Sequence, residues 1–398
     1  MKGHAHALLA GGMQALETLF PGFVENLADA GAVRVSVSID SQWERPGYDV
    51  FPRRDLGISV YTMTRPLLES VVRKHFNAIP NIKLHQRCRA QQLITSEGGS
   101  RVTGVSCLHS DGKVEDIPAD LVLDASSNGQ LTLNLLAAFG LPAPEETTVG
   151  IEMGYATTLF EIPPDAPTNW KTAYTLADPP SNRRGALLMT VEGNRWIVSL
   201  AGSHDSKPPE DEPGFMEFAQ KLRTRTIFNA INGARRCAPI ARYVLKASRW
   251  RHFENLEKLP IGLIPFGDTI CRFNPIYGQG MSVAAKEAVL LRDLLSASAV
   301  DNNGLHSVPG EFLAQAQPII DVPWATATVP DFLDPLTEGN RPDDLDKALE
   351  FSTGLMKLAY QDPAIHKLLF EVQYMLKPRS VLRAPEIVER VQAVMAEA

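Results

Sequence analysis

The chain of 398 residues contains only four cysteines, and no two of them form a CxxC motif. Cys88, Cys107, Cys237 and Cys271 are scattered, so their spacing indicates neither a disulfide framework nor a zinc site. Sparse, unpaired cysteines are typical of proteins in a reducing compartment, and we expect a cytoplasmic location.

Long apolar runs and an excess of positive charge are also missing. No stretch approaches the length of a membrane span, and the short apolar patch near the N-terminus is broken by Gly11 and Gly12, which argues against a signal peptide. Lys and Arg number 39 against 46 Asp and Glu, for a net charge of −7. This balance argues against a nucleic-acid partner or an anionic lipid surface.

The length predicts more than one hydrophobic core. Strand-like runs with few helices between them fill residues 147–250, which predicts an antiparallel sheet. Another strand is expected over 82–86. From Glu311 onward the pattern is helical, and we expect it to be interrupted at each proline, namely Pro318, Pro323, Pro330, Pro335 and Pro342.

The stretch 263–288 reads as a strand, a glycine-interrupted loop and a helix. Asp268 follows the buried strand, where a carboxylate can accept hydrogen bonds from vicinal hydroxyl groups. Gly278 and Gly280 allow the backbone to approach a ligand closely. The N–H groups of residues 279–282 lack helical partners and lie at the positive end of the helix dipole. A ligand with a polyol and an electron-accepting ring fits this pattern.

This stretch resembles the GD…P…GQG motif of FAD-dependent aromatic hydroxylases and related monooxygenases. The resemblance implies that Asp268 binds the ribityl chain, that Pro275 lies against the isoalloxazine, and that the helix start stabilises negative charge on the flavin. The matching residues are Gly267, Asp268, Pro275, Gly278, Gln279, Gly280 and Met281.

A second motif, 121–129, follows a short strand that ends in Asp124. It is similar to the D-A-x-G motif of the same family, whose Asp is associated with FAD and reduced nicotinamide binding, although Ser127 stands where glycine is usual and Asn128 where a basic residue is common. These two departures weaken the case for NAD(P)H binding, and NAD(P)H is named only as a candidate electron donor. The structural alternative is that Asp124 caps the helix after it. Arg65, at the head of a helix, resembles the family's cofactor-facing arginine.

The N-terminal HAHALLAGG resembles a segment that borders the active site in polyether-type epoxidases, a branch of this family. His4 and His6 have no Cys or acidic neighbour, so we predict no metal site there. The family opens with a GxGxxG βαβ unit that this sequence lacks. One explanation is a misplaced start or a decayed gene, in which case the intact relative is an FAD monooxygenase and this form binds FAD weakly or not at all. The other is a genuine short form that acts as a cofactor-poor binding protein. We expect an enzyme-derived chain with compromised cofactor binding.

Two other chemistries find little support. Gly202-Ser203-His204-Asp205 contains the residue types of a hydrolase triad, but a GxSxG elbow is missing. No tryptophan lies in the W-x-W-x-I-P segment that flavin halogenases carry.

The patterns predict an α/β (α+β) fold with an antiparallel sheet. The resemblance implies that an incomplete, Rossmann-like FAD-binding domain is interleaved with this sheet, which would form the substrate domain. We expect the FAD-binding domain to comprise residues 1–146 and 251–300, although 31–62 would contribute to the substrate sheet. Residues 147–250 would form the substrate-binding domain, and residues 301–398 a helical region. The resemblance implies an FAD-dependent monooxygenase that hydroxylates or epoxidises a hydrophobic polyketide- or terpenoid-like molecule. A non-catalytic binding protein and a flavin-dependent reductase of isoprenoid double bonds remain open, as does the oligomeric state.

Overall fold

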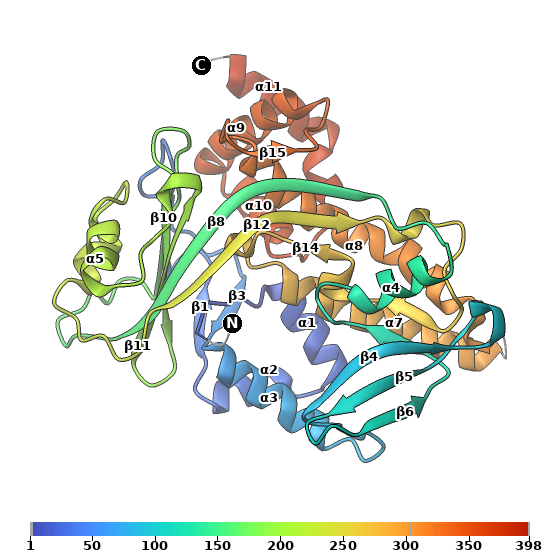
Figure 1. The fold of residues 1–398 in the computed structure, drawn as a ribbon. Coiled ribbons are helices and arrows are strands. Elements are labelled where there is room, and N and C mark those ends of the chain that lie inside the picture. The colour runs from blue at the N-terminus through green and yellow to red at the C-terminus, as the bar shows by residue number, and fades with distance from the viewer. Residues whose placement is uncertain (1–2, 302–303, 397–398) are drawn as a thin grey trace.

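The computed structural model describes residues 3–301 and 304–396, and a large twisted sheet forms one side of it (Figure 1). The strand order of this eight-stranded sheet is β14-β12-β8-β11-β10-β9-β2, with β15 paired to β8. All pairs are antiparallel except β2 with β9. The strands are β2 (Ser41–Glu44), β8 (Glu146–Glu161), β9 (Thr172–Thr175), β10 (Arg184–Val191), β11 (Arg195–Ser203), β12 (Ala241–Arg251), β14 (Cys271–Arg272) and β15 (Glu338–Gly339).

Strands β8 and β12 are long enough to connect this sheet to the rest of the molecule (Figure 1). Helices α5 (Glu212–Gln220) and α6 (Thr226–Ile231) contribute Phe215 and Ile227 to a core on the sheet, together with Phe160 and Trp196 of the strands. Apolar side chains thus bind two short helices to one end of the sheet.

A separate small sheet consists of two short parallel strands, β7 (Val122–Asp124) and β13 (Leu263–Pro265). Helix α4 (Gln130–Ala138) follows β7, and α7 (Gly280–Asp301) follows β13 after a loop. The main core joins this region to the N-terminal helices α1 (Ala10–Leu19), α2 (Phe23–Asp29) and α3 (Arg65–Asn77). Two further strands, β1 (Val33–Ser36) and β3 (Ser59–Thr62), pair with each other and not with the large sheet.

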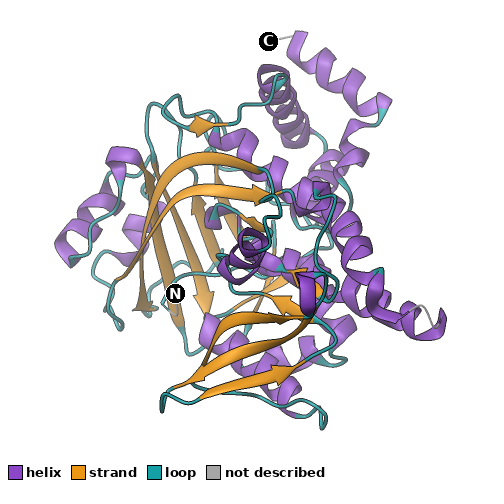
Figure 2. Cartoon of the chain, turned by 45° about the vertical axis from the view of Figure 1, so that its right-hand side comes forward, coloured by secondary structure: helices purple, strands orange, loops and turns teal. Residues whose placement is uncertain are grey.

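A separate three-stranded antiparallel sheet contains β4 (Cys88–Thr95), β5 (Val102–His109) and β6 (Val114–Pro118), as Figure 2 shows. The strand expected over 82–86 is wrong, because these residues form an extended loop without ladder partners in the described structure. Ile82 and Leu84 are exposed there, so no buried face holds them in a sheet.

The C-terminal region is helical: α8 (Val308–Asp331), α9 (Leu345–Gln361), α10 (Pro363–Gln373) and α11 (Pro385–Ala396). The expected breaks at Pro318, Pro323 and Pro330 are wrong, because all three lie inside α8. Buried side chains, including Phe312 and Ile320, pack α8 into the main core, and this packing outweighs the hydrogen bonds that proline removes.

The mixture of parallel and antiparallel sheets with C-terminal helices confirms the predicted α/β class. None of the helices described is both long and apolar enough to cross a membrane. The four cysteines are free thiols.

Candidate functional site

The carboxyl ends of β7 and β13 lie at the same edge of their small sheet. The two strands are parallel, with Pro265 opposite Asp124, and the Phe266 amide donates to the Asp124 carbonyl at 3.0 Å. Ligands of open α/β sheets bind outside this edge. The structure therefore brings together the two motifs that the sequence singled out.

The carboxylate of Asp124 is buried and already accepts four hydrogen bonds from the chain. Ser126 donates its amide at 3.1 Å and its hydroxyl at 2.5 Å, and Thr132 donates its amide at 3.1 Å and its hydroxyl at 2.7 Å. These bonds attach the loop after β7 to the first turn of α4. They match the structural alternative for Asp124, a carboxylate that holds the start of a helix.

Asp268 differs, because its carboxylate accepts no hydrogen bond from the described residues. It lies in the 3-10 turn η4 (Gly267–Thr269), directly after β13. Burial raises the pKa of Asp268, and the guanidinium groups of Arg272 and Arg65 oppose that rise. A half-buried acceptor without a donor is well suited to a ligand hydroxyl group.

Helix α7 begins beside this carboxylate. A Cβ built on Gly280 would lie 3.8 Å from Asp268 Oδ1. The backbone N–H groups of Gln279, Gly280 and Met281 meet no backbone acceptor in the part of the chain described, whereas the next amide, of Ser282, already bonds the Gln279 carbonyl. Unpaired amides at a helix start attract negative charge.

The side chain of Gln279 adds an unsatisfied acceptor to this helix start. Its residue is only 3% exposed, yet Oε1 has no hydrogen-bond partner among the described residues. Leaving a buried amide oxygen without a donor costs about 1–3 kcal/mol. A ligand that donates a hydrogen bond here would remove that cost.

The loop before α7 is shaped by Pro275 and Gly278. Pro275 opens the 3-10 turn η5 (Pro275–Tyr277) and is exposed, and Gly278 closes it with φ of 67°. A Cβ on Gly278 would lie 2.7 Å from the Ala7 Cβ. Glycine is therefore required both by the left-handed backbone and by the close approach of the N-terminal segment.

That N-terminal segment connects the large sheet to the site. His4 Nδ1 lies 3.3 Å from the Thr157 hydroxyl on β8, and the Leu9 amide donates to Ser282 Oγ on α7 at 2.9 Å. Residues 4–9 therefore run along one side of the predicted flavin loop. The segment borders the site as the sequence resemblance implied.

Arg65 lies at the head of α3, and its side chain is engaged by protein groups. Its Nε donates to Glu69 Oε1 at 2.7 Å, and its Nη1 lies 3.1 Å from His6 Nε2. His6 Nδ1 lies 2.8 Å from the His4 carbonyl, and burial lowers the His6 pKa, so His6 is neutral with its proton on Nδ1. The positive charge of Arg65 still acts on Asp268.

Sequence reasoning missed a buried polar network next to this loop. Asn274 Nδ2 and the Tyr277 hydroxyl donate to Asp331 Oδ1, each at 3.0 Å, and the Tyr155 hydroxyl donates to Asn274 Oδ1 at 2.6 Å. Asp331 Oδ2 is buried and meets no hydrogen-bond partner among the residues described. Burial raises the pKa of Asp331 to about 7, while the two donors lower it.

Glu287, on the second turn of α7, was also missed. It is fully buried, its Oε2 accepts the Gly267 amide at 2.9 Å, and its Oε1 has no partner among the described residues. Burial raises the pKa of Glu287 to about 7, the Gly267 amide lowers it, and the nearby charge of Asp268 raises it. Glu287 therefore supports the turn that carries Asp268.

A cavity of about 540 Å³ is lined in part by Phe266, the residue directly before the turn η4. Leu123 of β7 and Leu291 and Leu295 of α7 contribute to its wall.

Comparisons with known proteins bear on the fold. No protein-family model matches the sequence. "Protein Rv3254" of Mycobacterium tuberculosis is 30% identical over 305 residues, which cover 74% of this chain. The chain spans 63% of the length of that relative.

Two solved structures show the fold. The flavin-dependent brominase Bmp2 is similar with a TM-score of 0.69 and 12% identity over 99% of this chain and 89% of its own. The p-nitrophenol 4-monooxygenase PnpA of Pseudomonas putida DLL-E4 is similar with a TM-score of 0.64 and 14% identity, covering 95% of this chain and 90% of its own.

Proposed function

We propose that this chain, which has the fold of flavin-dependent monooxygenases and halogenases, is an FAD-dependent monooxygenase. Its substrate would be a hydrophobic small molecule, and its reaction a hydroxylation or an epoxidation. NAD(P)H is the candidate electron donor. The absence of the W-x-W-x-I-P segment from the sequence favours oxygenation over halogenation.

One observation carries the proposal: an unpaired carboxylate and unpaired helix-start amides lie side by side. Asp268 offers an acceptor, and Gln279, Gly280 and Met281 offer donors, in one small volume. Polar groups in a folded protein are normally satisfied, so a cluster of unsatisfied groups indicates that a ligand completes it.

The chemistry of these groups fits a flavin. Asp268 would accept hydrogen bonds from the ribityl hydroxyl groups. The amides of Gly280 and Met281 would stabilise electron density on the isoalloxazine, and exposed Pro275 would lie against the ring. The buried Gln279 oxygen would accept a hydrogen bond from a ligand N–H or O–H group. Arg65 would contribute positive charge, and Asp124 would act indirectly by holding α4.

The flavin would supply the redox and oxygen chemistry when bound. The residues of the chain would position it and control water and protons around it. The segment 4–9 would shield one side of the loop. Asp331 can hold a proton near neutral pH, because burial raises its pKa to about 7, and the Tyr277 hydroxyl would connect that proton to the loop.

Flavin binding tests the proposal. We expect a fluorescence titration of the purified chain with FAD to show binding, weaker than in a chain that also contains the GxGxxG unit, and Asp268→Ala to weaken it further. Asp293→Ala is the matched control, since Asp293 is an exposed aspartate further along α7 whose only described partner is the neighbouring Arg292. Equal FAD affinity of the Asp268 and Asp293 variants would contradict the proposed site.

Two alternatives predict different results. A non-catalytic binding protein would be folded but would retain no FAD. A flavin-dependent reductase of isoprenoid double bonds would retain FAD and would turn over without oxygen, so oxygen consumption coupled to product formation separates it from a monooxygenase.

A further inference from the structure

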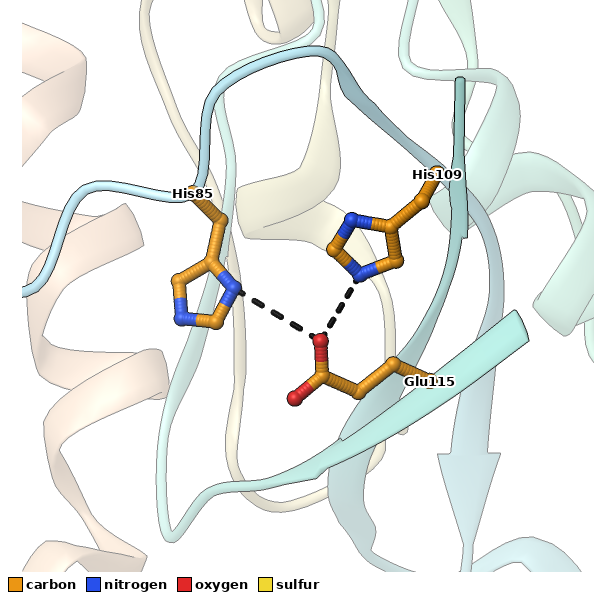
Figure 3. Close-up of side chains that lie close together, drawn as sticks. All are labelled: His85, His109 and Glu115. Atoms are coloured by element: carbon orange, nitrogen blue, oxygen red, sulfur yellow. Dashed lines mark hydrogen bonds and ion pairs between the residues drawn. The ribbon is translucent and has the colours of Figure 1, made fainter. Parts of the chain in front are cut away.

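A second cluster of chemically reactive side chains lies on the three-stranded sheet β4-β5-β6, separate from the flavin loop. The side chains are His85, His109 and Glu115, and Figure 3 shows both imidazole rings pointing toward the carboxylate. His85 comes from the loop between α3 and β4, whereas the other two come from β5 and β6. None of them belongs to the proposed function described above.

The strand register explains how these residues meet. Cys88 pairs with His109, and Cys107 pairs with Glu115. Directly opposite residues of an antiparallel pair point to the same face, and so do residues two apart on one strand. Cys88, Cys107, His109 and Glu115 therefore share one face of the sheet, and the preceding loop brings His85 onto it.

The distances in this cluster are close to those of a metal site. Glu115 Oε2 lies 2.7 Å from His109 Nε2 and 3.8 Å from His85 Nδ1. Cys88 Sγ lies 4.0 Å from His109 Nε2. In a tetrahedral zinc site, nitrogen and oxygen ligands lie about 3.3 Å apart, and sulfur and nitrogen about 3.6 Å. Shifts of under about 1 Å would bring the atoms of His85, His109 and Glu115 to the first value, because these atoms already lie within 4.8 Å of one another. Cys88 Sγ would have to move further to join them.

We propose that this face binds one Zn²⁺ ion through His85, His109, Glu115 and Cys88. Two imidazoles, a carboxylate and a thiolate form a donor set suited to zinc and unsuited to Mg²⁺ or Ca²⁺, which prefer oxygen. The ion would connect the loop before β4 to β5 and β6.

Cys107 does not belong to this ligand set. It is buried, whereas Cys88 is only half-buried and its Sγ lies 4.0 Å from His109 Nε2. The three residues around the proposed ion are half-buried or exposed, which leaves it a path from solvent: the side chains of His85, His109 and Glu115 are 23%, 24% and 39% exposed.

A simpler account is that His109 and Glu115 form only an ion pair. The His109 hydrogen bond and the charges of His85 and Lys83 lower the pKa of Glu115, so the carboxylate is ionised in either account. The ion-pair account predicts no specific effect of zinc. The two accounts therefore differ in a measurable way.

The experiment is a Zn²⁺ titration of the full chain, purified without a polyhistidine tag and freed of metal. We expect binding of one ion, with affinity reduced at least about 100-fold in His109→Ala and in the loop variant His85→Ala, since even second-shell changes cost 10–100-fold. His306→Ala is the matched control, because His306 is an exposed histidine beside Arg101. Equal affinity in wild type and both site variants would overturn the proposal.

Co²⁺ in place of Zn²⁺ tests the thiolate ligand. We expect an absorption band from thiolate-to-cobalt charge transfer in the wild type, lost in Cys88→Ser and kept in Cys107→Ser. A wild-type complex without this band would overturn the four-donor site.

Discussion

Glu287 provides a test of the physical description of the flavin turn, because it is a buried acid without a cationic partner among the described residues. We predict that Glu287→Gln stabilises the protein at pH 8. The glutamine keeps the shape and can still accept the Gly267 amide through its oxygen, as Glu287 does at 2.9 Å. The substitution removes the free-energy cost of ionising a buried carboxyl group.

The size and sign of this effect follow from the pKa of Glu287. Burial raises it from 4.5 to about 7 in the folded protein, so between these values the folded state binds more protons than the unfolded state. Wild-type stability therefore falls as pH rises from 4.5 and levels off above pH 7. At about 1.4 kcal/mol for each pH unit, the full loss is about 3 kcal/mol.

The assay is urea unfolding of wild type and Glu287→Gln between pH 4.5 and 8. We expect the variant to be more stable by up to about 3 kcal/mol at pH 8 and about equal near pH 4.5. The contribution of Asp331, whose pKa is also about 7, cancels because both proteins contain it. A constant difference across this range, or a destabilised variant at pH 8, would refute the reasoning.

The remaining predictions concern the flavin loop and its polar network. Gly278→Ala should lower the free energy of unfolding by at least about 1–2 kcal/mol and weaken FAD binding, since φ is 67° and the new Cβ would lie 2.7 Å from Ala7; urea unfolding and FAD titration measure both, and unchanged values would contradict the close contact. Asp331→Asn should reduce the loss of stability as pH rises from 3.8 to about 7, because the raised pKa of Asp331 disappears; a curve identical to wild type would show that Asp331 does not titrate there. Weaker FAD binding by Asp268→Ala, with Asp293→Ala as control, completes the set.

Local patterns were sufficient to predict the strand, loop and helix around Asp268. Only a short loop separates Asp268 from the start of α7. The glycines, the proline and the helical pattern of this stretch all indicated that loop. Parallel pairing of β7 with β13 then placed Asp124 at the same edge. That edge follows from general rules of α/β sheets.

Contacts between distant segments could not be predicted in this way. Asp331 meets Tyr277 only because α8 folds back on the loop, and Glu287 looked like any polar residue of an amphipathic helix. The prolines of α8 predicted breaks that do not occur, because burial of Phe312 and its neighbours outweighs local propensity. The cluster at His109 was invisible because strand register, and not sequence spacing, assembles it.

Hydrogen exchange of the full chain with and without FAD tests the central claim most directly, because it reports on the unpaired amides themselves. We predict that FAD slows exchange in peptides that contain Gln279, Gly280 and Met281, and leaves peptides of β4, β5 and β6 unchanged. FAD binding without protection at the start of α7 would contradict the assignment of this helix to the flavin.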